Sequence, residues 1–258
     1  MPSKNKTIPL TESSIHLFVN GFSFCTPSKT EFVPITDNIE DFKSALKDLL
    51  SFYPKETFSN TQIVSYHQPS TFVPDLFFDK NLLPNYLQLY GTVDEHSALN
   101  FDVLEEEKQV NVYSYPKLIL EILNQQLEKA TLCHYNSLLF KEVKEKSNAS
   151  DKKHQLYIHL QKGSMDLYLT QNASIIFQNH FGIQNEDEFL YYVFFVIEQY
   201  KLSNDQLELV FLGEIIAFQS YYQCIKEYHQ TVRFEDRKSC GTLDVDQHPA
   251  PFFAQSFN

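Results

Sequence analysis

The stretch Gln155–Gly213 constrains the fold of this chain more than any other part of the sequence. Three short runs in it alternate apolar and polar residues, as half-buried antiparallel strands do: Leu156–Leu160, Met165–Leu169 and Ser174–His180. A nearly continuous apolar run, Phe189–Ile197, follows and predicts a buried helix, with Asn185 placed to cap it. Leu207–Leu212 then predicts a closing strand. The stretch therefore predicts a β-β-β-α-β unit of an α/β fold.

The N-terminal part of the chain repeats this order of elements. Asn20-Gly21 lies between two apolar runs and predicts a hairpin, because both residues of such a turn accept positive φ. Asp37 is positioned to cap a helix that Pro54 ends. The predicted elements are strands at Ile15–Val19, Phe22–Cys25 and Phe32–Ile35, a helix at Ile39–Tyr53 and a strand at Gln62–Tyr66. We interpret the repeated order as an internal duplication.

A charged segment, Lys141–Lys153, predicts a linker between the two units, because it holds no large apolar residue after Val143. We therefore place a first lobe at residues 1–146 and a second at 147–258. The first lobe contains an inserted segment at about 69–115, followed by a helix that starts at Pro116 and a strand at Thr131–Leu139. The tail of the second lobe carries three phenylalanines, and we expect it to dock on the body or on a partner.

Composition excludes several classes of function. The formal net charge is −12, with 21 basic and 33 acidic residues, so the chain lacks the basic surplus that binding to nucleic-acid phosphates requires. The four cysteines form no CxxC pair and have no zinc-finger spacing, which predicts reduced thiols and no metal site. The sequence shows no signal-peptide pattern and no apolar run of membrane-spanning length. We expect a cytoplasmic protein that binds neither nucleic acid nor membrane.

Several short motifs, taken in order, resemble those of an uncharacterised bacterial family, a domain of unknown function with an actin-like ATPase (ribonuclease H-like) fold. The motifs are Phe72–Phe77 (FVPDLF), Val112–Lys117 (VYSYPK), His134, Leu138-Leu139, Phe189–Tyr200 (FLYYVFFVIEQY) and Leu209–Ile215 (LVFLGEI). The resemblance covers nearly the whole chain. It implies an α/β protein with two tandem ribonuclease H-like lobes, each with a mixed sheet built from a β-β-β-α-β unit.

The resemblance also states what ATPase chemistry would require. In actin-like ATPases the first hairpin turn of each lobe is rich in glycine and begins with an aspartate, which organises the metal and the attacking water. Here the two hairpins read HLFVNGFSF and IHLQKGSMD, with His159 at the aspartate-like position of the second. We therefore predict no catalytic residue, no metal and no cofactor. The positions at which a nucleotide contact would be retained are Gly163, Gly213 and Glu214.

The sequence leaves two hypotheses about function. The first is a non-catalytic, degenerate actin-like protein that acts through an unidentified protein partner, with homo-oligomerisation left open. The alternative is a divergent nucleotide-binding ATPase or sugar-kinase-like enzyme that uses the cleft between the lobes, for which Asp166 is the nearest available carboxylate. The histidines do not favour a metal site, since His154 and His159 are five residues apart on one strand and point to opposite faces.

Overall fold

The computed structural model describes residues 13–26, 29–35, 38–90, 93–148, 153–213, 216–235 and 249–250. The chain divides into two compact units between Ser137 and Leu138. None of the helices in these ranges combines the length and apolarity that a membrane span needs. The predicted lobe limits, 1–146 and 147–258, stay a prediction.

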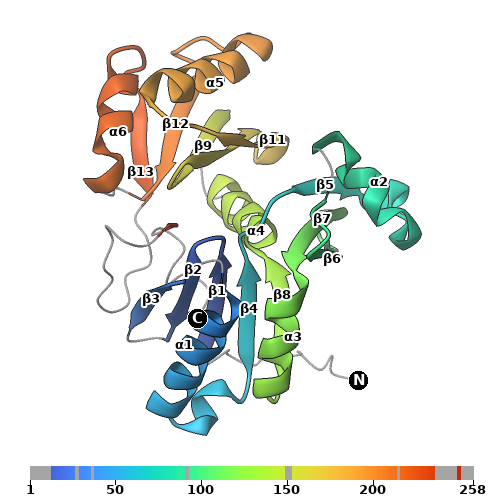
Figure 1. The fold of residues 1–258 in the computed structure, drawn as a ribbon. Helices are drawn as coiled ribbons and strands as arrows, with labels where there is room; N and C mark the ends of the chain where they lie inside the picture. Colours follow the sequence, from blue (N-terminus) through green and yellow to red (C-terminus); the bar gives the residue numbers. More distant parts are fainter. Residues whose placement is uncertain are drawn as a thin grey trace, which may run out of the picture. The chain divides into compact units, whose positions relative to one another are not determined.

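The first unit contains a five-stranded sheet in the order β3-β2-β1-β4-β8 (Figure 1). The strands are β1 (Ser13–Phe18), β2 (Gly21–Cys25), β3 (Thr30–Pro34), β4 (Thr61–Ser65) and β8 (Ala130–His134). β1 pairs antiparallel with β2 and parallel with β4, so the predicted hairpin, helix and closing strand are present. Helices α1 (Ile39–Phe52) and α3 (Lys117–Gln126) pack with the β1–β2 hairpin in one apolar cluster.

Two local predictions in this unit are corrected. The cap of α1 is Asn38, whose side chain accepts a hydrogen bond from the backbone N–H of Glu40, and the predicted cap Asp37 lies outside the described residues. The two-residue hairpin turn is Val19-Asn20, one position earlier than predicted, because Phe18 pairs with Gly21. Gly21 has a φ of 152°, and a Cβ there would lie 2.3 Å from the carbonyl oxygen of Val33. Glycine is therefore required by the close approach of β3 rather than by the turn itself.

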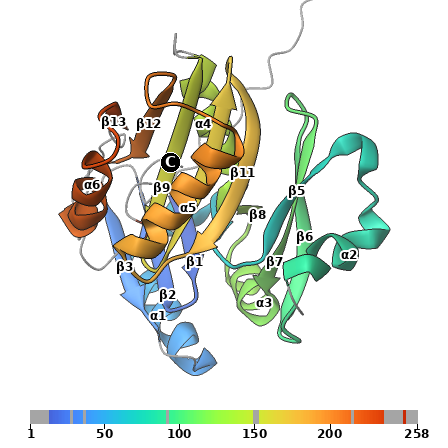
Figure 2. The same ribbon diagram turned by 90° about the horizontal axis from the view of Figure 1, so that it is seen from above.

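The inserted segment forms its own three-stranded sheet in the order β5-β7-β6, with a short helix beside it (Figure 2). Its elements are β5 (Ser70–Pro74), three single-turn 3₁₀ helices at Asp75–Phe77, Lys80–Leu82 and Gln88–Tyr90, α2 (Leu83–Leu87), β6 (Ser97–Leu104) and β7 (Gln109–Pro116). Strand β5, which contains the first half of the FVPDLF motif, was not predicted. Pro84 occupies the first turn of α2, where the missing N–H costs no hydrogen bond.

The second unit repeats the strand order of the first, as β11-β10-β9-β12-β13. Its elements are β9 (His154–Gln161), β10 (Ser164–Gln171), β11 (Ser174–Gly182), α5 (Glu186–Gln199), β12 (Leu207–Leu212), a 3₁₀ turn (Ile216–Phe218), α6 (Gln219–Lys226) and β13 (Val232–Glu235). The strands, the helix and its cap Asn185 were predicted in the right order. Strand β13 was not predicted, because the charged residues around it are typical of a tail.

Helix α4 (Tyr135–Asn148) replaces both the end of the predicted strand at Thr131–Leu139 and most of the predicted linker. Tyr135, Leu139 and Val143 are spaced four residues apart and are fully buried, which is the pattern of a helix face. On the charged side, Glu142 and Lys146 form an ion pair with their nitrogen and oxygen 3.3 Å apart. The helix continues through the charged segment because these residues are good helix formers.

Helix α5 is buried on one side only, although its sequence predicts burial on several sides. Phe189 and Val193 are fully buried, whereas Tyr191 and Phe195 are exposed. The exposed rings stack on each other with centroids 6.4 Å apart.

Candidate functional site

The β9–β10 turn of the second unit is the position at which an ATPase of this fold would hold phosphate. Gly163 in this turn has a φ of 80°, and a Cβ added there would meet no atom within 4 Å. The backbone N–H of Lys162 donates a hydrogen bond to the carbonyl oxygen of Pro249 at 2.9 Å. The turn therefore has open space at Gly163, but one of its backbone N–H groups already donates a hydrogen bond within the chain.

A row of three ionisable side chains crosses the sheet beside this turn. Asp166 on β10 lies opposite His159 on β9 and His180 on β11. The Nδ1 atom of His159 is 2.9 Å from Oδ2 of Asp166, and the Nδ1 atom of His180 is 2.8 Å from Oδ1. Gln161 donates its amide to Oδ2 at 2.9 Å. Both oxygens of the carboxylate accept hydrogen bonds from side chains of the same sheet.

Asp166 and His159 are fully buried, and His180 is partly exposed. Burial alone would raise the pKa of the Asp166 carboxyl. The charge of His180 and the hydrogen bonds from both histidines outweigh burial and hold the pKa of Asp166 well below its usual range. The carboxylate is therefore ionised, and since it can only accept, each imidazole donates its Nδ1–H to it.

This arrangement limits what Asp166 can do chemically. A carboxylate that organises Mg²⁺ and water for phosphoryl transfer needs an oxygen accessible to the metal. Within the described ranges, no group of three or more His, Cys, Asp or Glu side chains is arranged to hold a metal ion. The row instead resembles a buried hydrogen-bonded network that fixes three neighbouring strands.

Gly213, the second predicted ligand position, follows β12 and has a φ of 89°. Its N–H donates to the carbonyl oxygen of Glu235 at 2.7 Å, and its own carbonyl accepts the hydroxyl of Tyr222 at 3.0 Å. Glu214, the third position, lies outside the described residues. Both polar groups of the Gly213 backbone therefore serve the packing of β13 and α6, and the nucleotide contact stays a prediction.

The first unit has no aspartate in its β1–β2 turn, where Val19 and Asn20 are exposed. His16 on β1 is fully buried, and its Nε2 lies 3.1 Å from the hydroxyl of Ser14. The turn thus offers neither a carboxylate nor a run of glycine amides.

A buried polar network in the first unit was not predicted from the sequence. Asp102 on β6 accepts hydrogen bonds from the backbone N–H of His134 at 2.8 Å, the hydroxyl of Ser137 at 2.6 Å and the hydroxyl of Tyr113 at 3.0 Å. His134 donates its Nε2–H to the carbonyl oxygen of His67, since its Nδ1 accepts the N–H of Asn136. Burial, with the charge of Asp102, raises the pKa of Tyr113 far above its usual range, so the phenol is neutral. The network joins β6 and β7 to the start of α4, and the three hydrogen bonds that Asp102 accepts favour a structural role.

Comparisons with known proteins agree with this geometry. A family model described as "Protein of unknown function (DUF3822)" matches residues 6–232. A Bacteroides thetaiotaomicron protein with an actin-like ATPase fold and unknown function is similar in structure, with a TM-score of 0.71 and 18% sequence identity over 88% of this chain and 91% of that chain. PilM of a PilM–PilN type IV pilus biogenesis complex has a TM-score of 0.58 and 11% identity over 95% and 96%. A search of curated proteins finds no match. The predicted actin-like fold and the family resemblance are confirmed.

Proposed function

The chain belongs to the family of proteins of unknown function DUF3822, and for this member we propose a non-catalytic role: it acts by binding another protein rather than by hydrolysing nucleotide. The observation that carries the proposal is the position of Asp166. It is the carboxylate nearest to the β9–β10 turn in the sequence, and both of its oxygens are engaged by His159, His180 and Gln161. Hydrolysis in this fold depends on a metal-organising carboxylate, and a buried, histidine-bound one is unsuited to that task.

The β9–β10 turn supports the same proposal. A phosphate is held in such turns by several converging backbone N–H groups. Here the N–H of Lys162 is taken by Pro249, and glycine occurs once in the turn. A phosphate would have to displace an internal hydrogen bond in order to reach that amide.

Protein binding is supported by the inserted segment. Leu76, Phe77 and Leu89 are each more than two-thirds exposed, and Leu82 and Tyr90 are exposed as well. Water-exposed apolar side chains at this density in a short segment are typical of protein contact surfaces. The structural neighbour PilM comes from a PilM–PilN type IV pilus biogenesis complex, and we take this as support for a protein-binding role of this chain. The repeated strand order of the two units supports the inference that one unit arose from the other by duplication.

The alternative, a retained nucleotide site, is favoured by one observation: the open space beside Gly163. In that case Gly163, Gly213 and Glu214 would contact the nucleotide, as the sequence predicts. Contact without hydrolysis would still be compatible with a regulatory, non-catalytic protein.

Calorimetric titration separates the two candidates. The wild-type protein is titrated with ATP, ADP and GTP in the presence of Mg²⁺, and the Gly163→Ala variant serves as a control whose added methyl group meets no neighbouring atom. The proposal predicts no binding heat. Saturable heat that disappears in Gly163→Ala would favour the nucleotide-binding alternative.

The proposed binding to a partner protein is tested with purified candidate partners and the double variant Phe77→Ser, Leu89→Ser. The Tyr191→Ser variant on α5 is the matched control, because Tyr191 is also an exposed aromatic residue. Loss of binding in the double variant but not in the control would support the inserted segment as the contact surface. Equal binding by all three proteins would place the contact elsewhere.

A further inference from the structure

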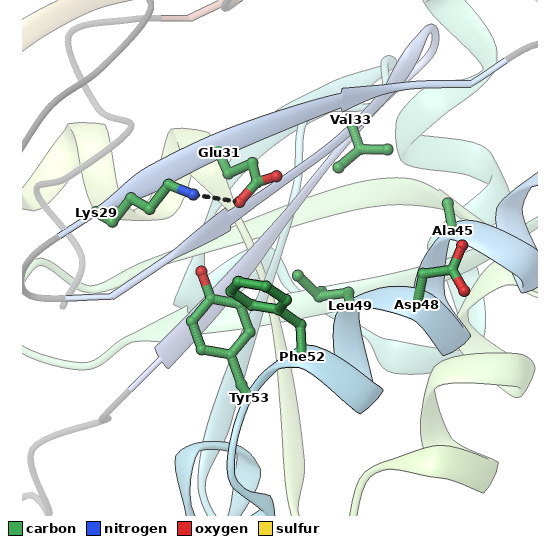
Figure 3. A pocket seen from close by; sticks show the side chains of 8 residues that line it. All are labelled: Lys29, Glu31, Val33, Ala45, Asp48, Leu49, Phe52 and Tyr53. Carbon is green, nitrogen blue, oxygen red and sulfur yellow. Dashed lines mark hydrogen bonds and ion pairs between the residues drawn. The ribbon is translucent and has the colours of Figure 1, made fainter.

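A pocket of about 330 Å³ lies between β3 and α1 of the first unit (Figure 3). Its apolar floor is formed by Val33 from the strand and by Ala45 and Leu49 from the helix. The aromatic rings of Phe52 and Tyr53 close one end. This volume is within the range of pockets that receive a small ligand or one large side chain.

The charged groups on the rim are unequal in number. Lys29 and Glu31 pair with each other on the strand side, with Nζ and Oε2 2.7 Å apart. Asp48 lies on the helix side, and in the part of the chain that the structure describes no cation forms an ion pair with it. After the internal pair is set aside, the rim therefore carries one uncompensated negative charge.

The helix itself adds to this negative potential. The pocket lies along the C-terminal half of α1, where the unsatisfied carbonyl groups carry the negative end of the helix dipole. The last turn of α1 contains no basic residue, although that is the position at which one would be stabilising. Asp48 and the helix end therefore both favour a cation.

The aromatic end favours a cation with a flat or apolar body. Tyr53 is held in place by Phe24 and Phe58, at centroid distances of 4.8 and 6.3 Å. Phe52, by contrast, is 77% exposed at the rim of the pocket. A guanidinium group stacks on such a ring and also forms two parallel hydrogen bonds to a carboxylate.

From these features we propose that the pocket receives an arginine side chain presented by a partner protein. Its methylene stem lies on Leu49, and its guanidinium group stacks on Phe52 and pairs with Asp48. Because Phe52 is 77% exposed, its ring also contacts an apolar residue next to the arginine, which is why a protein segment is the occupant rather than free arginine. This inference is independent of whether the second unit binds nucleotide, and it names a contact surface apart from the inserted segment.

The test uses acetyl-Leu-Arg-Leu-amide as the probe and the full chain with ¹³C-labelled methyl groups. The expected result is a saturable chemical-shift change at the methyl groups of Val33, Ala45 and Leu49. Replacing the arginine by citrulline, which has the same shape and no charge, is expected to weaken binding about tenfold, the factor that corresponds to about 1.4 kcal/mol. Free arginine amide is expected to bind more weakly than the peptide.

Two variants in the pocket and two matched variants outside it complete the test. Asp48→Asn and Phe52→Ala are expected to weaken binding of the probe severalfold, while Glu121→Gln and Leu118→Ala, an exposed acid and an exposed leucine on α3, leave it unchanged. Since all four side chains lie at the surface, the variants are expected to fold. Shift changes outside the pocket, equal binding of the citrulline peptide, or free arginine amide binding as tightly as the peptide would each overturn the proposal.

Discussion

His180 lies directly opposite Asp166 on the neighbouring strand, with Nδ1 2.8 Å from Oδ1, because the β10–β11 pairing shifts between Leu169 and Thr170. Near the turn, Gln171 pairs with Ser174 and Thr170 with Ile175. Continued without the shift, this register would place Asn179 opposite Asp166. The bulge places His180 there instead, and thereby completes the hydrogen-bonded row.

Removing the charge of Asp166 is expected to destabilise the second unit strongly. Asp166→Asn removes the charge and replaces one acceptor oxygen by an NH₂ donor, so at least one of the two histidines loses its acceptor. A buried donor left unsatisfied in this way costs about 1–3 kcal/mol, and more where a charged group is involved. Urea unfolding of the variant measures the loss. Glu198→Gln, an exposed acid on α5, serves as the control and is expected to change the free energy of unfolding by less than about 0.5 kcal/mol.

A double-variant cycle distinguishes a coupled hydrogen-bonded network from simple packing. His180→Gln is expected to be clearly destabilising in the wild-type background and much less so in the Asp166→Asn background, because the interaction has already been lost. Additive free-energy changes would contradict the network.

Acid sensitivity is expected from His67 in the first unit. Burial lowers its pKa from 6.5 to about 4, and in the described part of the chain its Nδ1 has no hydrogen-bond partner. Between pH 6.5 and pH 4, His67 is therefore protonated in the unfolded chain and neutral in the folded chain. The free energy of unfolding contributed by the neutral side chain is fully present above pH 6.5 and is lost as the pH falls to 4. His67 accounts for at most about 3 kcal/mol of this loss.

The measurement is urea unfolding at pH 7 and pH 4.5 for the wild type and for His67→Gln. The variant is expected to lose less stability between the two pH values. Asp166 contributes little between pH 7 and pH 4.5, because the stability that comes from its lowered pKa is lost only as the pH falls from the unfolded-state value of 3.8 toward the folded-state value. Parallel losses in both proteins would show that His67 is not the sensitive group.

The two hairpin glycines are expected to respond differently to alanine. Gly21→Ala places a Cβ 2.3 Å from the carbonyl oxygen of Val33, so β3 must move, and we expect a loss of more than about 2 kcal/mol. Gly163→Ala meets no neighbouring atom and carries only the cost of a positive φ, about 1–2 kcal/mol. Thermal unfolding of both variants compares them, and a larger loss for Gly163→Ala would contradict this assignment.

The sequence predicts the order of elements in both units well, because alternation and helical spacing report directly which faces are buried. It fails where two signals compete. In α4, the charged residues 141–148 are typical of a linker, but the spacing of Tyr135, Leu139 and Val143 continues a helix into them. In β13, four half-buried residues lie in a charged context, and only pairing with β12 makes them a strand.

The candidate site was predictable only in part. Counting back from the turn at Lys162-Gly163 pairs Asp166 with His159, so that contact was available from the sequence. The contact with His180 was not, because a bulge leaves no clear mark in the residue pattern. The hydrogen bond from Lys162 to Pro249 joins residues far apart in the chain and likewise needs the structure.

The central claim, that this actin-like protein does not hydrolyse nucleotide, is tested most directly by phosphate release from ATP with Mg²⁺ and excess protein. We expect a rate equal to that of buffer alone, for the wild type and for the Gly163→Ala and Glu214→Gln variants. Magnesium-dependent release by the wild type that either substitution abolishes would contradict it.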